Sequence, residues 1–253
     1  MVRYHGNVTK LPDPVLTQVL TLTDLGLACS YEGELLLDYP EPSVSPTRED
    51  SPSFAPPAPA ARLSSPQYQS GSTFRDSIDT LGIDPEAAMI LDDIRFLTLS
   101  ITSPTSSTKV IKIQSTASWL HNRVASLPPL TSKTETELIN SSVRLSALVY
   151  TSCIVSLTPF TQVTHHLAEI KKHISRVPMS RWKNIPGIFL WILMVISPTC
   201  GPGIDDRKWR KKMPVTAMAI GLEGFGLGIA YLRANWLVQR WIARERDARR
   251  EGV

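Results

Sequence analysis

The stretch WKNIPGIFLWILMVISP, residues 182–198, constrains the fold more than any other part of this chain. Between Ile185 and Ile196 only Pro186 and Gly187 interrupt the hydrophobic residues, which gives a run of roughly 12 residues where a membrane-spanning helix needs about 20. The run is also too apolar for the surface of a soluble domain. It therefore predicts a short central helix buried in protein.

The rest of the chain has the pattern of a helical domain of ordinary size. Its 253 residues are 42% hydrophobic, which suits one folded domain with a tail. Apolar residues recur at helical spacing, proline and Asp84-Pro85-Glu86 mark helix ends, and no stretch alternates like a strand. We expect helices over about 84–102, 110–126, 134–157, 162–176, 185–196, 215–229 and 231–250.

These elements predict an all-α fold, a single irregular helical domain with a central buried helix and a disordered N-terminal linker. Residues 40–74 contain 8 prolines and 8 serines and offer almost nothing to bury. We therefore divide the chain into an acidic and hydrophobic N-terminal segment (1–39), a Pro/Ser-rich disordered linker (40–77) and a helical domain (78–253).

The N-terminal segment admits two interpretations. Its stretch LTDLGLACSYEGELLLDYP mixes leucines with four acids, Asp24, Glu32, Glu34 and Asp38, a composition typical of segments that fold against a partner groove. Alternatively, Pro14 to Cys29 forms a helix docked on the main domain. The sequence leaves both open.

Charge is distributed unevenly along the chain although the net charge is only +4. Residues 1–95 carry 6 Lys or Arg against 14 Asp or Glu, whereas residues 171–253 carry 16 against 6. This polarity favours an acidic interaction arm and a basic face, or else it reflects solvated charge without a partner.

The cysteines and the N-terminus indicate a protein of a reducing intracellular compartment. Cys29, Cys153 and Cys200 are odd in number and far apart, so they predict neither a disulfide framework nor a CxxC metal pair. The N-terminal sequence MVRYHGNVTKLPDPV has no apolar core of the kind that a secretory signal requires.

Two groups of residues are candidate regulatory sites. Ser45, Ser51 and Ser65 each precede a proline and are candidate sites for proline-directed phosphorylation. Five basic residues interleaved with Trp209 form a candidate nuclear-import or phosphate-contact cluster in a basic turn over 205–212: Arg207, Lys208, Arg210, Lys211 and Lys212. A solvated turn between helices explains the cluster equally well.

No catalytic, metal or cofactor site is expected. His165, Glu169 and His173 are spaced four apart and would share one helix face, but polar surface helices produce this pattern by chance, so we predict no metal there. The glycines of GLEGFGLGIA do not have dinucleotide-binding spacing, and Gly224 and Gly228 instead favour close helix packing in the core. Nothing resembles a nucleophile elbow or a P-loop, so we predict that the chain is not an enzyme.

Several blocks, taken together and in order, resemble the regulatory domain of fungal-specific transcription factors, the region that follows their zinc binuclear cluster. The blocks are LGIDPEAAMILDDIRFLTLSI from Leu81, STASWLHNRVASLPPL from Ser115, SVRLSALVYTSCI from Ser142, RWKNIPGIFLWILMVISP from Arg181 and LRANWLVQRWI from Leu232. The resemblance covers about residues 78–243.

The resemblance implies an all-helical domain in a nuclear regulator of transcription, with the transcription machinery, a complete family member or a second copy of the chain as partner. The chain lacks the six closely spaced cysteines of the zinc cluster, so direct DNA binding is not expected. The alternative is a membrane-associated protein using 185–196 and 215–232 as hydrophobic segments. Glu223 and the shortness of the first segment argue against it, and we expect no membrane contact.

Overall fold

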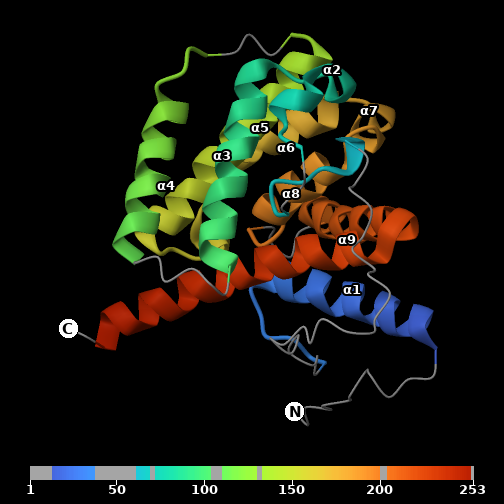
Figure 1. Ribbon diagram of the computed structural model, residues 1–253, viewed down its shortest axis with the longest axis vertical. Helices are drawn as coiled ribbons and strands as arrows, with labels where there is room; N and C mark the ends of the chain where they lie inside the picture. The colour runs from blue at the N-terminus through green and yellow to red at the C-terminus, as the bar shows by residue number, and fades with distance from the viewer. Residues whose placement is uncertain are drawn as a thin grey trace, which may run out of the picture.

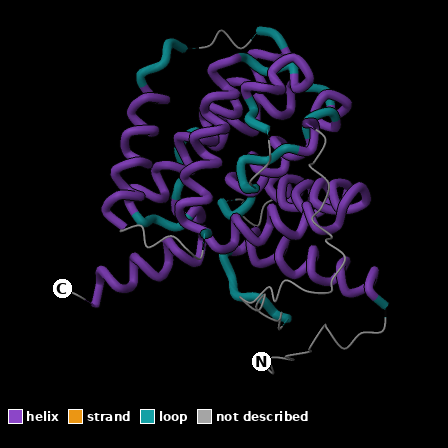
Figure 2. The backbone as a smooth tube through the Cα atoms, in the orientation of Figure 1, coloured by secondary structure: helices purple, strands orange, loops and turns teal. Residues whose placement is uncertain are grey.

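The computed structural model describes residues 13–37, 61–68, 72–103, 110–129, 133–199 and 204–251, and within them every regular element is helical (Figure 2). The all-α prediction is therefore confirmed for this part of the chain. The α-helices are α1 (Pro14–Tyr31), α2 (Ile78–Leu81), α3 (Pro85–Thr102), α4 (Val110–Ala125), α5 (Glu135–Ser156), α6 (Leu167–Arg176), α7 (Met179–Lys183), α8 (Pro186–Ile196) and α9 (Ile204–Glu251), with short 3-10 turns at Ala61–Leu63, Arg75–Ser77 and Phe160–Gln162.

Helix α8 is the buried centre of the fold, as its apolar run predicts. Every residue from Pro186 to Ile196 is buried, and the helix packs against α5 on one side and α9 on the other (Figure 1). Helices α3 and α4 pack on α5, α6 packs on α5, and α1 lies along α9. Edge-to-face contact between Tyr150 and Trp191, with ring centroids 6.2 Å apart, joins α5 to α8.

Helix starts and stops follow local sequence signals where these are strong. Thr134 and Glu137 form a capping box that begins α5, since each side chain accepts from the other residue's backbone N–H. Pro85 begins α3 in its first turn. The predicted helix over 162–176 is wrong at its start, because His166 takes a left-handed conformation (φ 64°) and α6 begins only at Leu167.

Helix α9 is one uninterrupted helical run from Ile204 to Glu251, but it folds back on itself. A Cβ built on Gly228 would lie 3.0 Å from the carbonyl oxygen of Ala217, whereas these positions would be about 16 Å apart in a straight helix. The N-terminal helix α1 contacts both parts, since Ser30 reaches Met213 while Cys29 reaches Leu232. The chain thus reverses in the glycine-rich run GLEGFGLG (Figure 1).

We call residues 204–222 the first arm of α9 and residues 226–251 the second arm. The sequence predicted two helices here, with the break at Ala230 and a basic turn over 205–212. Both details are wrong: Ala230 and Tyr231 lie within the second arm, and residues 205–212 are helical. Gly228 is buried where a side chain would press on Leu22, which explains a glycine at this position. The close packing predicted for Gly228 is confirmed.

The N-terminal segment docks on the domain, which decides between its two interpretations. Helix α1 buries Leu22, Leu25 and Cys29. The carboxylate of Asp24 accepts from the backbone N–H groups of Leu36 and Leu37, at 3.0 Å in each case, and so folds the chain after α1 back onto the helix. Asp24 therefore holds the segment in place, and Glu32 does the same by accepting from the backbone N–H groups of Phe160 and Thr161.

Part of the predicted linker is also packed in the domain, which corrects its boundary. Residues 61–68, which we call the strap, bury Leu63 and Gln67, and the hydroxyl of Tyr231 donates to the carbonyl of Leu63 at 2.7 Å. Farther along, Phe74 is buried beneath the guanidinium of Arg95, 4.3 Å from the ring centroid. The correction arises because contacts from distant helices bury a segment whose own composition predicts disorder; residues 38–60 lie outside the described part of the chain.

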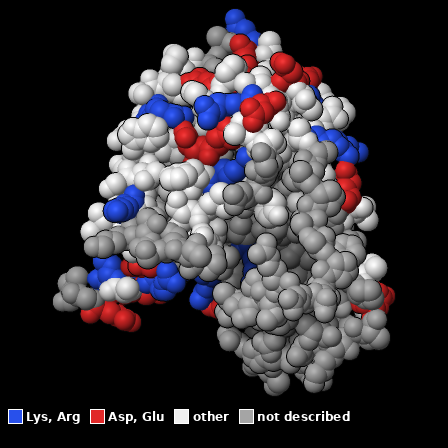
Figure 3. Space-filling view, in the orientation of Figure 1, with Lys and Arg blue, Asp and Glu red and all other residues white. Residues whose placement is uncertain are grey.

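On one face of the molecule the charge polarity of the sequence is not seen (Figure 3). On the face in Figure 3, acidic and basic side chains are interspersed over the upper part of the molecule. Ion pairs join the front of the chain to the back, as between Glu34 and Arg240, and others lie within the helical domain, as between Asp93 and Arg123 at 2.6 Å. The front acid Glu34 and the rear base Arg240 thus neutralise each other.

Among the described helices, α5 is long and apolar enough to cross a membrane, and 72% of its most apolar window is buried inside the protein. This is the pattern of a core helix. Of the two segments considered as membrane segments, 185–196 is fully buried, and 215–232 contains the reversal of α9.

Candidate ligand-binding cavity

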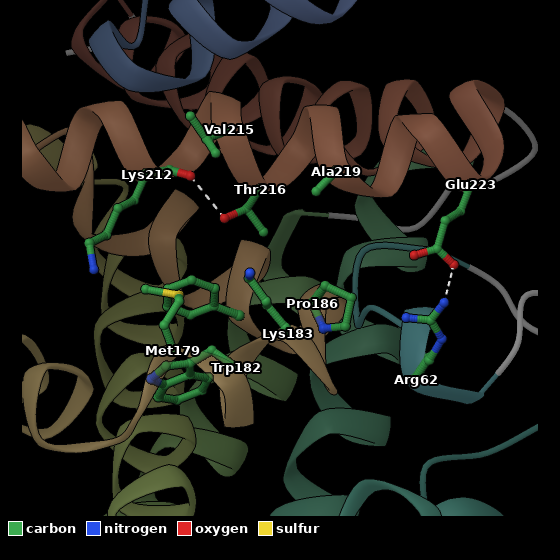
Figure 4. A pocket seen from close by; sticks show the side chains of 11 residues that line it. Arg62, Met179, Trp182, Lys183, Pro186, Lys212, Val215, Thr216, Ala219 and Glu223 are labelled. Carbon is green, nitrogen blue, oxygen red and sulfur yellow. Dashed lines mark hydrogen bonds and ion pairs between the residues drawn. The ribbon is translucent and has the colours of Figure 1, made fainter.

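A cavity of about 460 Å³ lies between α7, the start of α8, the first arm of α9 and one end of the strap (Figure 4). This volume falls in the range of small-molecule sites, roughly 300 to 1,000 Å³. Its walls are mainly apolar, and they are formed by Arg62, Met179, Trp182, Lys183, Pro186, Phe189, Lys212, Val215, Thr216, Ala219 and Glu223.

The aromatic wall of the cavity is held rigidly by local sequence. Pro186 begins α8 just after α7 ends, and this arrangement stacks the ring of Phe189 on Trp182, with centroids 4.8 Å apart and planes inclined by 21°. The indole N–H of Trp182 donates to the carbonyl of Ile174 at 3.3 Å. Both rings are almost fully buried, with 0% and 3% of their surfaces exposed, so this wall is rigidly packed.

The opposite wall is one face of the first arm of α9. Lys212, Thr216, Ala219 and Glu223 follow one another at intervals of three or four residues and therefore share a helix face. The hydroxyl of Thr216 donates to the backbone carbonyl of Lys212 at 2.8 Å and is occupied within the helix. This wall thus presents a small side chain, Ala219, between two charged residues.

The charged groups of the cavity are of two kinds. At one end Arg62 and Glu223 form an ion pair, so their charges offset each other (Figure 4). Within the described part of the chain, Lys183 and Lys212 have no carboxylate at ion-pair distance. Burial lowers the pKa of Lys212, and the positive charge of Lys208 lowers it further. The cavity therefore combines apolar walls with two ammonium groups that lack a counter-charge from the described residues.

The basic cluster predicted from the sequence is split by its helical conformation. Arg207, Lys208 and Lys211 are exposed, while Trp209 between them is buried. The guanidinium of Arg210 lies over the ring of Tyr31 at 4.7 Å, and Lys212 belongs to the cavity. Three of the five residues thus remain on an exposed face; an import or phosphate-contact role for them stays a prediction.

Of the candidate phosphorylation sites, Ser65 is placed by the structure and it is inaccessible. Its side chain is buried in the strap, and its hydroxyl oxygen accepts from the backbone N–H of Gln67 at 3.3 Å. In the folded chain the buried hydroxyl of Ser65 is out of a kinase's reach, and phosphorylation there stays a prediction. Ser45 and Ser51 lie outside the described residues.

The histidine pattern does not assemble a metal site. His165 precedes α6, and His173 is buried with its Nε2 3.8 Å from the carboxylate of Glu169. Within the described residues no cluster of three potential ligands could hold a metal ion. The cysteines of this part, Cys29 and Cys153, are free and buried, and burial raises the pKa of Cys29 to about 12.

Sequence reasoning missed the cavity because its walls come from three distant parts of the chain. One signal was present: Gly187 is the only residue without a side chain in the apolar run, and a Cβ there would overlap the backbone oxygens of Leu63 and Ser64 in the strap. That glycine marks where another segment approaches α8. Nothing in the sequence indicated which segment it was.

Comparison with protein-family models, with curated proteins and with solved structures finds no match for this chain.

Proposed function

We propose that this chain is a non-enzymatic regulator of transcription that acts through its helical domain, with the cavity between α7, α8 and α9 as its effector site. The observation that carries the proposal is the cavity: it has the volume and apolar walls of a small-molecule site. Partners would be the transcription machinery, a complete member of the resembled family or a second copy of the chain, in the nucleus.

The chemistry of the cavity walls supports binding over catalysis. Its lining residues include no histidine or cysteine, and the hydroxyl of Thr216 is directed to the backbone of its own helix. Nucleophilic catalysis needs a nucleophile within hydrogen-bond reach of a base. The lining amines of Lys183 and Lys212 have no carboxylate at ion-pair distance among the described residues, and Glu223 is paired with Arg62, so the lining assembles no such pair. An effector, by contrast, needs only shape and a few polar contacts.

Signal transmission from the cavity has a structural route. The strap reaches the cavity through Arg62 and is anchored to the second arm of α9 through Leu63 and Tyr231. The first arm carries the cavity wall, and α1 packs on both arms. A ligand that moves the first arm against α8 would therefore alter the surface formed by α1 and α9, which we propose as the partner surface.

The docked N-terminal segment changes how the proposal must be tested. Because α1 and the strap are part of the core, deleting residues 1–75 would expose the apolar surface beneath them and unfold the domain. A loss of activity after this deletion would not identify an activation arm. Point substitutions that leave the fold intact are needed instead.

The experiment is a reporter assay with the full chain fused to an unrelated DNA-binding domain. The test variant is Ala219→Phe, which fills the cavity from an exposed wall position, and the control is Ala168→Phe on the exposed face of α6. We expect Ala219→Phe to change reporter output several-fold at equal protein level, with Ala168→Phe matching the parent. A fusion without any effect on transcription, or a tagged chain outside the nucleus, would contradict the proposal.

A further inference from the structure

The cavity has a charge pattern that its apolar walls alone do not require. Arg62 and Glu223 neutralise each other at one end, and this leaves the ammonium groups of Lys183 and Lys212 as its uncompensated charges among the described residues. In Figure 4, the Lys183 side chain points upward into the centre of the cavity, and that of Lys212 lies at the end opposite the ion pair. The positive charge is thus concentrated away from the strap.

The two lysines differ in exposure: Lys183 is exposed, whereas Lys212 is half-buried. Lys212 is partly buried, and its ammonium lies 5.2 Å from the centre of the Trp209 ring, a contact it shares with Lys208. A cation that is partly removed from water gains more from an anionic partner than an exposed one does. An anionic group between Lys183 and Lys212 would supply that partner.

The apolar part of the cavity lies next to these charges. Trp182 and Phe189 are almost fully buried behind this part, with 0% and 3% of their surfaces exposed, and the exposed apolar lining includes Met179 and Ala219. Because the paired Arg62 and Glu223 close the far end without net charge, nothing there calls for a second charged group. The geometry therefore selects a molecule with one charged end and one apolar body.

We propose that the cavity binds a small organic acid with an apolar body, its carboxylate held between Lys183 and Lys212 and its body lying against Met179 and Ala219. This inference rests on the proposed effector site and adds the ligand class. The body is an alkyl chain or an aromatic ring system, which share the same chemistry at this wall. The carboxylate supplies the counter-charge, and burial of the body supplies most of the affinity.

The test compares three probes that have the same twelve-carbon chain and different head groups: dodecanoate, dodecan-1-ol and dodecyltrimethylammonium. Calorimetric titration of the full chain, with each probe below its aggregation threshold, gives the three dissociation constants. We expect dodecanoate to bind roughly tenfold or more tightly than the alcohol, since a charge-assisted hydrogen bond exceeds a neutral one by about that factor. The cation should bind most weakly. A parallel titration with 2-naphthoate shows whether an aromatic body serves as well as an alkyl one.

Variants assign the preference to the named residues. Lys183→Met and Lys212→Met keep the length of the side chain and remove the charge, so each should reduce dodecanoate affinity several-fold and leave the alcohol unaffected. Ala219→Phe should weaken both probes. Lys112→Met, an exposed lysine of α4 far from the cavity lining, is the matched control and should change neither.

The outcomes separate this inference from the proposed function. Equal binding of the acid and the alcohol, or a preference that survives both Lys→Met substitutions, overturns the organic-acid proposal while the cavity remains an effector site. If no probe binds and Ala219→Phe also leaves reporter output unchanged, the proposal that the cavity is an effector site is contradicted as well. Dodecanoate binding that is lost in the lysine variants supports the organic acid even where the transcription assay is negative.

Discussion

The packing of the strap against α8 can be tested by adding one methyl group. Gly187 lies in the first turn of α8, and a Cβ built there would overlap the carbonyl oxygens of Leu63 and Ser64 and lie 2.7 Å from the carbonyl carbon of Ser64. These are backbone atoms, so the strap must move if Gly187 becomes alanine. The substitution therefore tests whether the strap is part of the folded domain.

The magnitude follows from what the strap contributes. Displacing it exposes Leu63, whose burial is worth about 2 kcal/mol, and breaks the hydrogen bond from Tyr231 to Leu63, worth about 1 kcal/mol. Alanine is favoured over glycine in a helix by up to about 1 kcal/mol, which acts in the opposite direction. We expect Gly187→Ala to lower the free energy of unfolding by about 2 kcal/mol.

Urea unfolding of the full chain, followed by tryptophan fluorescence, measures this change. At a slope of about 2 kcal/mol per molar urea the midpoint should fall by about 1 M. The control is Gly226→Ala, since a Cβ at this helical position has no neighbour within 4 Å and alanine should stabilise the chain slightly. In the double variant with Leu63→Ala the two losses should not add, because both act on the same contact.

The reasoning would be refuted if Gly187→Ala raised the midpoint as Gly226→Ala does. Helix propensity would then decide the outcome at both positions, and the strap would not lie against α8. A fall of the expected size that added fully to the loss from Leu63→Ala would also count against the strap, since it would locate the strain elsewhere in α8.

Three further predictions concern the N-terminal acids, the buried serine and a buried histidine. Asp24→Ala should cost about 2 kcal/mol in urea unfolding, because it leaves the backbone N–H groups of Leu36 and Leu37 without their carboxylate; Asp79→Ala, at an exposed position, should cost almost nothing. A proline-directed kinase should phosphorylate Ser65 only after urea is added, as mapped by mass spectrometry, and modification of the native chain would contradict the buried strap. Burial lowers the pKa of His173 in the folded chain, so on acidification the unfolded chain binds this proton first. The contribution of neutral His173 to the free energy of unfolding is therefore complete above about pH 6.5 and is lost as the pH falls below that value. His173→Gln should make unfolding midpoints at about pH 7.5 and pH 5.5 more alike, and an unchanged difference would exclude this histidine as the cause.

The elements that could be predicted from sequence are those whose signals are local. The apolar run of α8, the capping box at Thr134 and the proline at Pro85 each act within one or two turns, so their helices begin where expected. The start of α6 could not be predicted because His166 adopts a left-handed conformation, which a glycine would have indicated in the sequence but a histidine does not.

The features that could not be predicted depend on contacts between distant residues. The composition of the strap predicts disorder, and only the close approach to Gly187 and the hydrogen bond from Tyr231 make it part of the core. Likewise, the acids of the N-terminal segment suggested solvation, yet Glu32 accepts from the backbone at Phe160, 128 positions away. The cavity combines three such remote pieces, so no window of sequence contains its pattern.

The strength of these contacts indicates where a ligand would enter. The ion pair of Arg62 and Glu223 is exposed, with 45% and 38% of the side-chain surfaces accessible, and a pair in such surroundings contributes about 1 kcal/mol or less. One residue farther along, Leu63 is held by burial and by Tyr231, so the strap stays in place when the pair opens. The far wall, by contrast, is fixed by the stacked rings of Trp182 and Phe189, although other lining residues, Met179 and Val215, are exposed too. Entry past Arg62 therefore leaves the fold intact. An organic acid that enters at this end brings its carboxylate to Lys183 and Lys212 only if the carboxylate goes in before the apolar body. Because Arg62 offsets the charge of Glu223 at this end, Arg62→Met would leave the Glu223 carboxylate unpaired at the entrance. This substitution should therefore slow the association of an organic acid more than it weakens the complex at equilibrium.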